Sequence, residues 1–133
     1  PFMEYLRKKY ICRKQIKKGI NGVKETINFI KNNNSIAIMI DQRVSEGEKI
    51  NFFNEPALTT TLPAKLSTKF CLDIIPVFIE RKADGNFKIE FQKRIKPENF
   101  KNKIELTEKL NKVLEMMIIK NPDQWIWTHN RWK

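Results

Sequence analysis

The chain has 133 residues, a length that suits one domain with a hydrophobic core, and we expect residues 1–133 to form a single domain. Hydrophobic residues make up 41% of it and charged residues 31%, which excludes a disordered chain, and its longest apolar run is far too short to cross a bilayer. The only two cysteines offer neither a disulfide framework nor a metal site, so we expect a reducing compartment, no cofactor and no metal.

Positive charge dominates the chain, with a formal net charge of +11 and a pI near 9.8. Residues 1–33 hold nine Lys/Arg and two Glu, a net of +7. Such a block attracts polyanions, namely nucleic acid, anionic lipid headgroups or an acidic protein. A second explanation stays open. Twenty of the 26 basic residues are lysines, as an AT-rich genome would produce, and part of the charge then belongs to a solvated surface.

Two helices are predicted in the N-terminal third. Residues 2–10 place Phe2, Leu6 and Tyr10 on one face, with basic side chains turned away. A basic connector at residues 13–18 and a second amphipathic helix at residues 23–31 follow, and three consecutive asparagines end that helix.

An apolar run at residues 36–40 predicts a buried strand, as in a parallel or mixed sheet covered by helices. Asp41 follows it directly, at the end of the strand where ligands bind in open α/β sheets. Residues 41–62 show little periodicity and are expected to form a long loop, which in a compact domain is usually functional or disordered. The adjacent Phe52 and Phe53 argue against disorder.

The second half alternates short strands with helices. Pro63 suits the first turn of a helix that runs to about Phe70. Residues 74–80 form an apolar strand in which Pro76 indicates an edge or a break. The remaining elements are a hairpin turn at 83–86, a strand at 87–92 and a long helix at 105–120. The buried stripe expected on this helix comprises Leu106, Leu110, Val113, Leu114 and Met117.

All three tryptophans and the only histidine lie in residues 121–133. Tryptophan is large, and its indole N–H normally needs a partner when it is buried. This aromatic and basic cluster is therefore either a latch that closes the domain or a wall of a site for an anionic or apolar ligand.

Three stretches carry a resemblance to a known family. They are Ile-Asp-Gln-Arg at 40–43 with Phe-Phe-Asn-Glu-Pro-Ala-Leu-Thr-Thr at 52–60, then Ile-Pro-Val-Phe-Ile-Glu-Arg at 75–81, and finally Asn-Pro-Asp-Gln-Trp-Ile-Trp-Thr-His-Asn-Arg-Trp-Lys at 121–133. Together they resemble the bacterial lipid A biosynthesis acyltransferases, the lauroyl/myristoyl family. Asn54 departs from the pattern, which usually has glycine there.

The resemblance implies an α/β fold, a mixed sheet flanked by helices like that of the glycerol-phosphate acyltransferases. It implies transfer of a fatty acyl chain from acyl carrier protein to a lipid A precursor, a phosphorylated glycolipid, at the inner membrane. The family's catalytic His-x-x-x-x-Asp/Glu pair is absent, because His129 is the only histidine and no carboxylate follows it at that spacing. We therefore expect this chain to be the C-terminal portion of such an enzyme, incomplete at its N-terminus, with the membrane anchor and the catalytic pair upstream, and to be inactive alone.

Several residues are candidates for the site. Asp41 is expected to support catalysis without being the base; the alternative is a capping or loop residue. The candidates for substrate binding are Arg13, Arg43, Phe52, Phe53, Thr60 and Arg81. Their alternatives are solvated surface arginines, phenylalanines that anchor the loop, and threonines that cap the next helix. His129 is expected to be a hydrogen-bonded structural residue.

Two other classes of function compete with the enzyme. A basic nucleic-acid-binding module would explain the pI, but the aromatic residues are clustered at one end and no binding signature is present, so no nucleic-acid partner is expected. A non-catalytic, acyltransferase-like interaction domain would explain the missing catalytic pair. The expected partners are acyl carrier protein, a phosphorylated glycolipid and an anionic membrane surface on its cytoplasmic side.

Overall fold

The computed structural model describes residues 2–17 and 19–132. By their contacts the residues group into two compact units, Pro1–Ala37 and Ile38–Lys133. Lys18, in the expected basic connector, and Lys133, in the terminal motif, lie outside the described residues. A single domain over residues 1–133 stays a prediction.

The first unit contains two helices, as predicted: α1 spans Phe2–Tyr10 and α2 spans Ile20–Lys31. Helix α2 ends at Lys31, directly before the run of asparagines expected to stop it. Gly22 lets α2 approach the preceding segment, because a Cβ built there would lie 1.7 Å from the carbonyl oxygen of Lys17. No helix of the described residues combines the length and hydropathy needed to cross a membrane.

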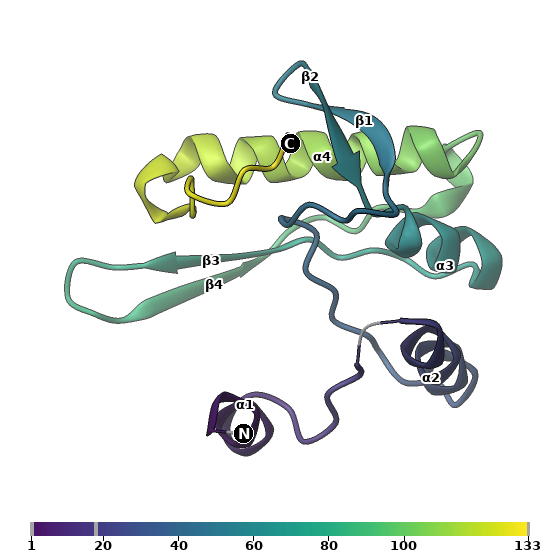
Figure 1. Cartoon of the computed structure of the whole chain (residues 1–133), viewed down its shortest axis with the longest axis horizontal. Coiled ribbons are helices and arrows are strands. Elements are labelled where there is room, and N and C mark those ends of the chain that lie inside the picture. The colour runs from purple at the N-terminus through teal and green to yellow at the C-terminus, as the bar shows by residue number, and fades with distance from the viewer. Residues whose placement is uncertain (1, 18, 133) are drawn as a thin grey trace. The chain divides into compact units, whose positions relative to one another are not determined.

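The second unit is built around one long helix, α4, at Lys103–Lys120 (Figure 1). Strands β1 (Glu48–Phe52) and β2 (Glu55–Thr59) form one antiparallel hairpin, and β3 (Val77–Arg81) and β4 (Phe87–Phe91) form another. Helix α3 spans Leu62–Phe70, and the short 3-10 turns η1 and η2 span Pro97–Asn99 and Pro122–Gln124. Helices and strands therefore both occur, as the α/β prediction requires.

The predicted strand at residues 36–40 is wrong, because this segment is irregular and mostly exposed in the structure. Met39 is 79% exposed, and only Ile40 packs against the core of the second unit. A strand needs a ladder of backbone partners, and the strands of the described residues pair only within their own hairpins. The single mixed sheet is accordingly replaced there by two separate antiparallel sheets, and the likeness to the glycerol-phosphate acyltransferase fold stays a prediction.

The long loop expected at residues 41–62 contains the β1–β2 hairpin instead. Phe52 pairs with Glu55, which leaves Phe53 and Asn54 as a two-residue turn with φ of 51° and 65°. Positive φ at both positions is the geometry of a type I′ turn, which matches the twist of a hairpin. The sequence concealed this turn because its usual Asn-Gly signal is absent. Asparagine tolerates the left-handed region, so Asn54 fits where glycine is more common.

We expect Asn54→Val to lower the free energy of unfolding by about 1–2 kcal/mol, because a β-branched side chain is strained at this positive φ. Asn51→Val, at an exposed position of β1, is the matched control and should leave stability unchanged within about 0.5 kcal/mol. Urea denaturation of both variants measures the difference. Equal stability of the two variants would contradict the turn assignment.

The core of the second unit lies along the predicted stripe of α4. Leu106, Leu110 and Val113 are buried with Ala64 of α3 and with Ile95, and Met117 packs beside them. The helix begins where Asn102 accepts hydrogen bonds from the backbone N–H groups of Ile104 and Glu105, at 2.8 and 3.1 Å. The remaining stripe residue, Leu114, faces a second core cluster beneath the β1–β2 hairpin.

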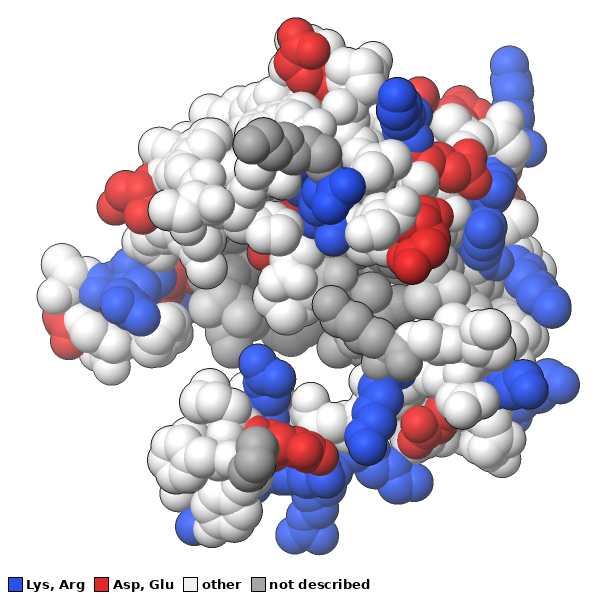
Figure 2. Space-filling view, viewed as in Figure 1, with Lys and Arg blue, Asp and Glu red and all other residues white. Residues whose placement is uncertain are grey.

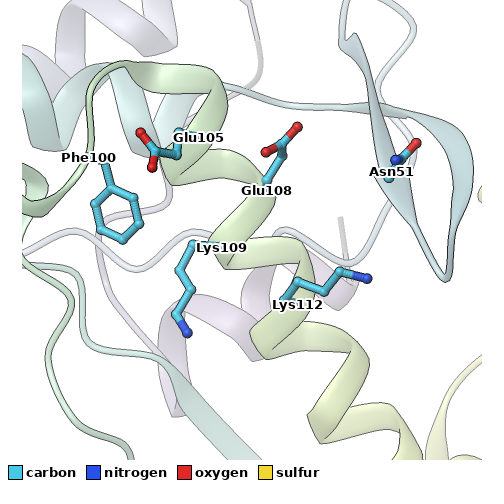
Figure 3. Close-up of a pocket in the computed structure, with 6 residues that line it drawn as sticks. All are labelled: Asn51, Phe100, Glu105, Glu108, Lys109 and Lys112. Atoms are coloured by element: carbon cyan, nitrogen blue, oxygen red, sulfur yellow. The ribbon is translucent and has the colours of Figure 1, made fainter.

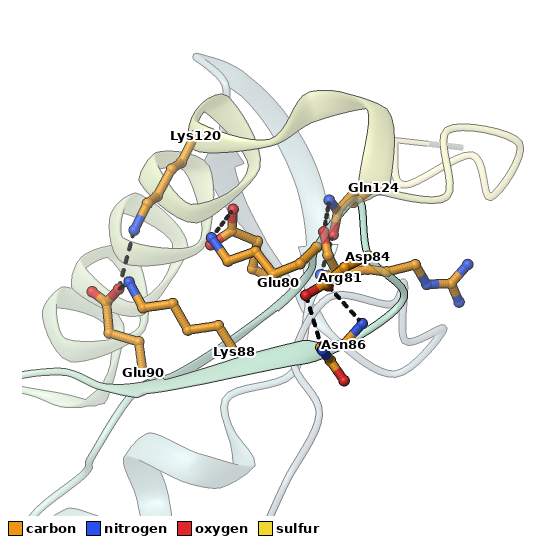
Figure 4. A network of polar contacts seen from close by, with 9 residues as sticks. Glu80, Arg81, Asp84, Asn86, Lys88, Glu90, Lys120 and Gln124 are labelled. Carbon is orange, nitrogen blue, oxygen red and sulfur yellow. Dashed lines mark hydrogen bonds and ion pairs between the residues drawn. The ribbon is translucent and has the colours of Figure 1, made fainter.

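The β3–β4 hairpin turns its polar face toward α4 and its apolar face outward. Lys120 of α4 forms an ion pair with Glu90 at 3.1 Å (Figure 4). Its ammonium group also lies over the ring of Phe78. The outward side chains stay exposed, namely Val77, Ile79, Phe87, Ile89 and Phe91. Strand β3 begins directly after Pro76, which confirms the break predicted there.

The hairpin turn predicted at residues 83–86 is confirmed, and Asp84 organises it. Its carboxylate accepts hydrogen bonds from the backbone N–H and the side-chain amide of Asn86, at 3.0 and 2.9 Å (Figure 4). These bonds, chiefly the backbone one, hold the pKa of Asp84 below its usual value.

Because the folded-state pKa of Asp84 is lowered, its stabilisation of the turn is complete above the ordinary aspartate pKa and is lost as the pH falls through the lowered value. We expect the chemical shift of the Asn86 amide proton to change as Asp84 becomes protonated. The midpoint of this change should lie below that of aspartate in an unstructured peptide. An NMR pH titration measures it, and a midpoint at or above the peptide value would contradict this role.

Candidate functional site around the C-terminal tail

The tail after α4 folds back onto the β1–β2 hairpin and joins an aromatic cluster. Phe52 of β1 is fully buried at its centre, with ring centroids 5.9 Å from Trp125 and 5.6 Å from Trp132. Trp127 meets Trp125 edge-on at 4.7 Å, and Phe53 meets Phe52 at 4.9 Å. Edge-to-face pairs at these separations are favourable beyond the apolar area they bury. The cluster therefore fixes the tail to the hairpin.

Two indole N–H groups of the cluster bind backbone carbonyls. Trp132 donates to the carbonyl of Phe52 at 3.0 Å, and Trp127 donates to that of Pro122 at 2.6 Å. The first bond joins the tail to β1, and the second holds the turn within the tail. Of the two interpretations of the tail, the domain latch is the one these contacts support.

Arg131 is the most deeply buried charged residue described, with none of its surface exposed. Its guanidinium donates to the backbone carbonyl of Leu58 and, at 2.8 Å, to the hydroxyl of Thr59, and it lies over the ring of Phe52. Burial lowers the pKa of Arg131, an effect that the negative charge of Asp41 partly opposes. The side chain thus crosses from the tail into the β1–β2 hairpin.

A buried polar network continues from Arg131 to α4. Asn111 of α4 donates to the carbonyl of Asn51 at 2.9 Å and to the hydroxyl of Thr59 at 3.4 Å. Thr59 in turn donates to the carbonyl of Ala57. The network joins the tail, the hairpin and α4 through side chains that are almost fully buried. Such a network orients its members because each hydrogen bond restricts the next.

Asp41 lies at the edge of this network and is half-buried. Its Oδ1 atom is buried and has no hydrogen-bond partner among the described residues, and the same holds for Nε of Arg131. The charge of Asp41 acts on Arg131 through space, without a direct ion pair. Among the described residues, the Oδ1 atom of Asp41 therefore lacks the hydrogen bond that a buried polar atom normally makes.

His129 has the structural contact expected of it. Its Nε2 atom accepts a hydrogen bond from the backbone N–H of Arg43 at 3.1 Å. The bond ties the segment after Asp41 to the tail and uses the ring nitrogen as an acceptor. A general base needs a free acceptor nitrogen and an orienting carboxylate, whereas this nitrogen is already occupied.

Gln124 joins the tail to the second hairpin. Its side-chain amide accepts from the backbone N–H of Arg81 at 2.8 Å and donates to the carbonyl of Arg81 at 2.9 Å (Figure 4). This pair reproduces the two hydrogen bonds that a neighbouring strand would make. The tail therefore covers one position on the free edge of β3.

The structure brings some of the candidates named from the sequence together at the tail and places the others elsewhere. Asp41, Arg43 and Phe52 come together with the tail, and the backbone of Arg81 joins it through Gln124. Phe53 is half-buried, and its backbone N–H donates to Glu115 of α4 at 2.8 Å.

Thr60 accepts a hydrogen bond from the backbone N–H of Leu62, the first residue of α3, at 3.2 Å, whereas the N-cap residue Thr61 makes no side-chain capping bond. Arg13 is exposed and belongs to the other unit.

A shallow surface pocket of about 340 Å³ lies away from the tail, along the exposed side of α4 (Figure 3). Its lining residues are Asn51, Phe100, Glu105, Glu108, Lys109 and Lys112. Its carboxylates and ammonium groups have mixed signs, and it contains none of the candidate residues. The arrangement around the tail, in contrast, combines a buried carboxylate oxygen, exposed arginines and aromatic walls.

The family model for bacterial lipid A biosynthesis acyltransferase matches residues 7–133, nearly the whole chain. No individual curated protein matches the chain.

Proposed function

Because the chain belongs to the bacterial lipid A biosynthesis acyltransferase family, we propose that it acts in the transfer of a fatty acyl chain from acyl carrier protein onto a lipid A precursor. Membership gives an acyltransferase function in general, with an acyl donor and a lipid acceptor. The family match over residues 7–133 is the observation that carries the proposal.

The proposed donor and acceptor suit the charge of the chain. Acyl carrier protein is acidic and the acceptor glycolipid is phosphorylated, so a chain of net charge +11 attracts both. Figure 2 shows lysine and arginine side chains over much of the visible face, with acidic side chains among them. Arg13, Arg43 and Arg81 are exposed, and an arginine can bind a phosphate through two parallel hydrogen bonds.

Asp41 is proposed to support catalysis by accepting a hydrogen bond from a substrate group near the tail. An alcohol is a poor nucleophile until a positioned base removes its proton. His129 is engaged with the backbone of Arg43, and the sequence holds no other histidine. We therefore propose that the 133-residue chain binds its substrates without transferring the acyl group.

Proteins of the lipid A biosynthesis family are generally membrane-associated, and the proposed location of this chain is the cytoplasmic face of the inner membrane. There the acyl donor is available from the cytoplasm and the acceptor from the bilayer. An anionic membrane surface is accordingly the third proposed partner.

We expect acyl carrier protein to bind the chain with an affinity that falls at least about tenfold between about 0.05 M and about 0.5 M salt, because exposed charges are screened over this range. Isothermal titration calorimetry measures the affinity. The double variant Arg13→Gln and Arg43→Gln should weaken binding more than Arg94→Gln combined with Lys93→Gln, which removes the same charge elsewhere. Equal losses of affinity in the two double variants would mean that Arg13 and Arg43 have no particular part in binding acyl carrier protein.

The competing functions predict other outcomes of the same titration. Displacement of acyl carrier protein by short DNA, but not by a phosphorylated glycolipid, would favour a nucleic-acid-binding module. Binding of acyl carrier protein without any binding of the glycolipid would favour a non-catalytic interaction domain. Binding of both partners supports the proposed function.

A further inference from the structure

Helix α1 gathers its apolar side chains on one arc. At about 3.6 residues per turn, Phe2, Met3, Leu6 and Tyr10 project from the same side of the helix. None of its residues is buried, and the exposed fractions of Phe2 and Tyr10 both reach 71%. A short helix in water normally covers such an arc, because packing supplies most of its stability. Leu6 is half-buried and the other three side chains are exposed, so most of the arc of α1 is uncovered.

Basic side chains border this arc on both sides. Arg7 follows one border and Lys9 lies beyond the other, where its ammonium group sits 5.2 Å from the ring centroid of Tyr10 and 5.6 Å from that of Tyr5. The only acidic residue, Glu4, points away from the arc and is paired with Lys8 at 2.8 Å. The pair holds the pKa of Glu4 below its usual value, so Glu4 stays ionised and paired at neutral pH.

The segments around α1 carry the same sign of charge. Arg13, Lys14 and Lys17 follow the helix and are exposed or half-exposed, and residues 1–33 have a net charge of +7. A second copy of this unit is therefore an unfavourable partner, because the two would repel each other. The surface requires an occupant that is both apolar and anionic.

We propose that α1 is an interfacial helix that lies flat on an anionic lipid surface, with its apolar arc in the headgroup boundary. The arginine and lysine at the borders extend their stems along the apolar region while their charged ends contact the headgroups. The ion pair of Glu4 and Lys8 then faces water. The carboxylate of Glu4, which an anionic surface repels, is thereby turned away from the lipid. This inference shares only the membrane partner with the proposed function and does not require acyl transfer.

The test uses the whole chain and vesicles of phosphatidylglycerol and phosphatidylcholine, compared with pure phosphatidylcholine. The double variant Phe2→Gln and Leu6→Gln should weaken flotation with the anionic vesicles at least about tenfold, because two apolar side chains no longer leave water. The matched control is Met116→Gln with Ile119→Gln, two exposed apolar residues of α4. It should change binding less than about twofold.

A second pair of variants separates position from net charge. The first double variant is Arg7→Gln with Lys9→Gln, and the second is Lys24→Gln with Lys31→Gln. Both remove the same charge from the same unit, and all four residues are exposed. Only the first pair borders the apolar arc, so it should weaken binding to anionic vesicles more than the second. Circular dichroism checks that α1 stays helical in each variant.

Three results would overturn the inference. Unchanged vesicle binding in the Phe2 and Leu6 variant would mean that charge alone attracts the chain. Equal losses of vesicle binding in the two double charge variants would mean that the position of the charges beside the apolar arc of α1 does not matter. Binding of acyl carrier protein without any binding of vesicles would identify an acidic protein as the partner. Detection of acyl transfer, or failure to bind acyl carrier protein, would bear on the proposed function alone and would leave this inference intact.

Discussion

Phe52→Ala is expected to lower the free energy of unfolding of the second unit by about 4 kcal/mol, the largest effect of any single substitution considered. The side chain is fully buried among Ala57, Ile118 and the tryptophans of the tail, so its removal leaves a cavity and separates the tail from β1. All three tryptophans lie in the tail, and their fluorescence during urea denaturation follows this loss directly.

The control for Phe52 is Phe91→Ala, because Phe91 is a strand phenylalanine that is 73% exposed. It should change stability by less than about 0.5 kcal/mol. A small loss for Phe52→Ala, comparable to that of the control, would mean that the tail does not pack on the hairpin.

Arg131→Ala is expected to lower the free energy of unfolding by about 3 kcal/mol, because it removes one hydrogen bond to the carbonyl of Leu58 and one to the hydroxyl of Thr59 and creates a cavity beside Phe52. Arg131→Lys keeps the charge but cannot reach both acceptors with one ammonium group, so it should cost about 1–2 kcal/mol. Urea denaturation, followed by fluorescence and by circular dichroism, measures both variants.

Arg94→Ala is the matched control, because Arg94 is exposed and paired only with Asp73 at the surface. Its removal should cost less than about 1 kcal/mol. If Arg131→Lys were as stable as the unchanged protein, the paired hydrogen bonds to Leu58 and Thr59 would contribute nothing, and the latch would rest on the aromatic residues alone.

The helices were predictable because their apolar residues repeat at the helical period over several turns. The stripe of α4 lies in the core as expected, and α3 begins at Leu62, one residue before the proline that indicated it. Features that depend on a single residue were also predictable, as with the break at the proline before β3 and the turn that contains the aspartate between β3 and β4.

Elements that depend on distant partners were not predictable. The run at residues 36–40 has the composition of a buried strand, but a strand forms only where another backbone pairs with it. The β1–β2 hairpin was hidden by a turn of Phe53 and Asn54, a pair without the usual glycine. Local composition shows neither which backbone will pair with a strand nor that a turn forms without glycine.

The site was partly predictable. The tail was recognised as a coherent cluster, and His129 was expected to be structural, which its contact with Arg43 supports. The roles of Arg131 and Asn111 were missed, because an arginine and an asparagine are normally surface residues. The available signal for Arg131 was its position among three tryptophans, where a guanidinium can lie over a ring and still reach backbone carbonyls.

The tail therefore organises the candidate site. Through Arg131, His129 and Gln124 it holds the neighbourhood of Asp41, the backbone of Arg43 and the edge of β3. Each of these contacts is structural, and each lies beside a residue proposed to meet the substrates.

An acyl-transfer assay with the purified 133-residue chain tests this account most directly. Acyl carrier protein thioester and a lipid A precursor are supplied, and labelled glycolipid product is measured beside His129→Asn. We expect binding of both substrates and no product above the reaction without protein. Product formation by the chain that is lost in His129→Asn would contradict it, because His129 would then be the base rather than a structural residue of the tail.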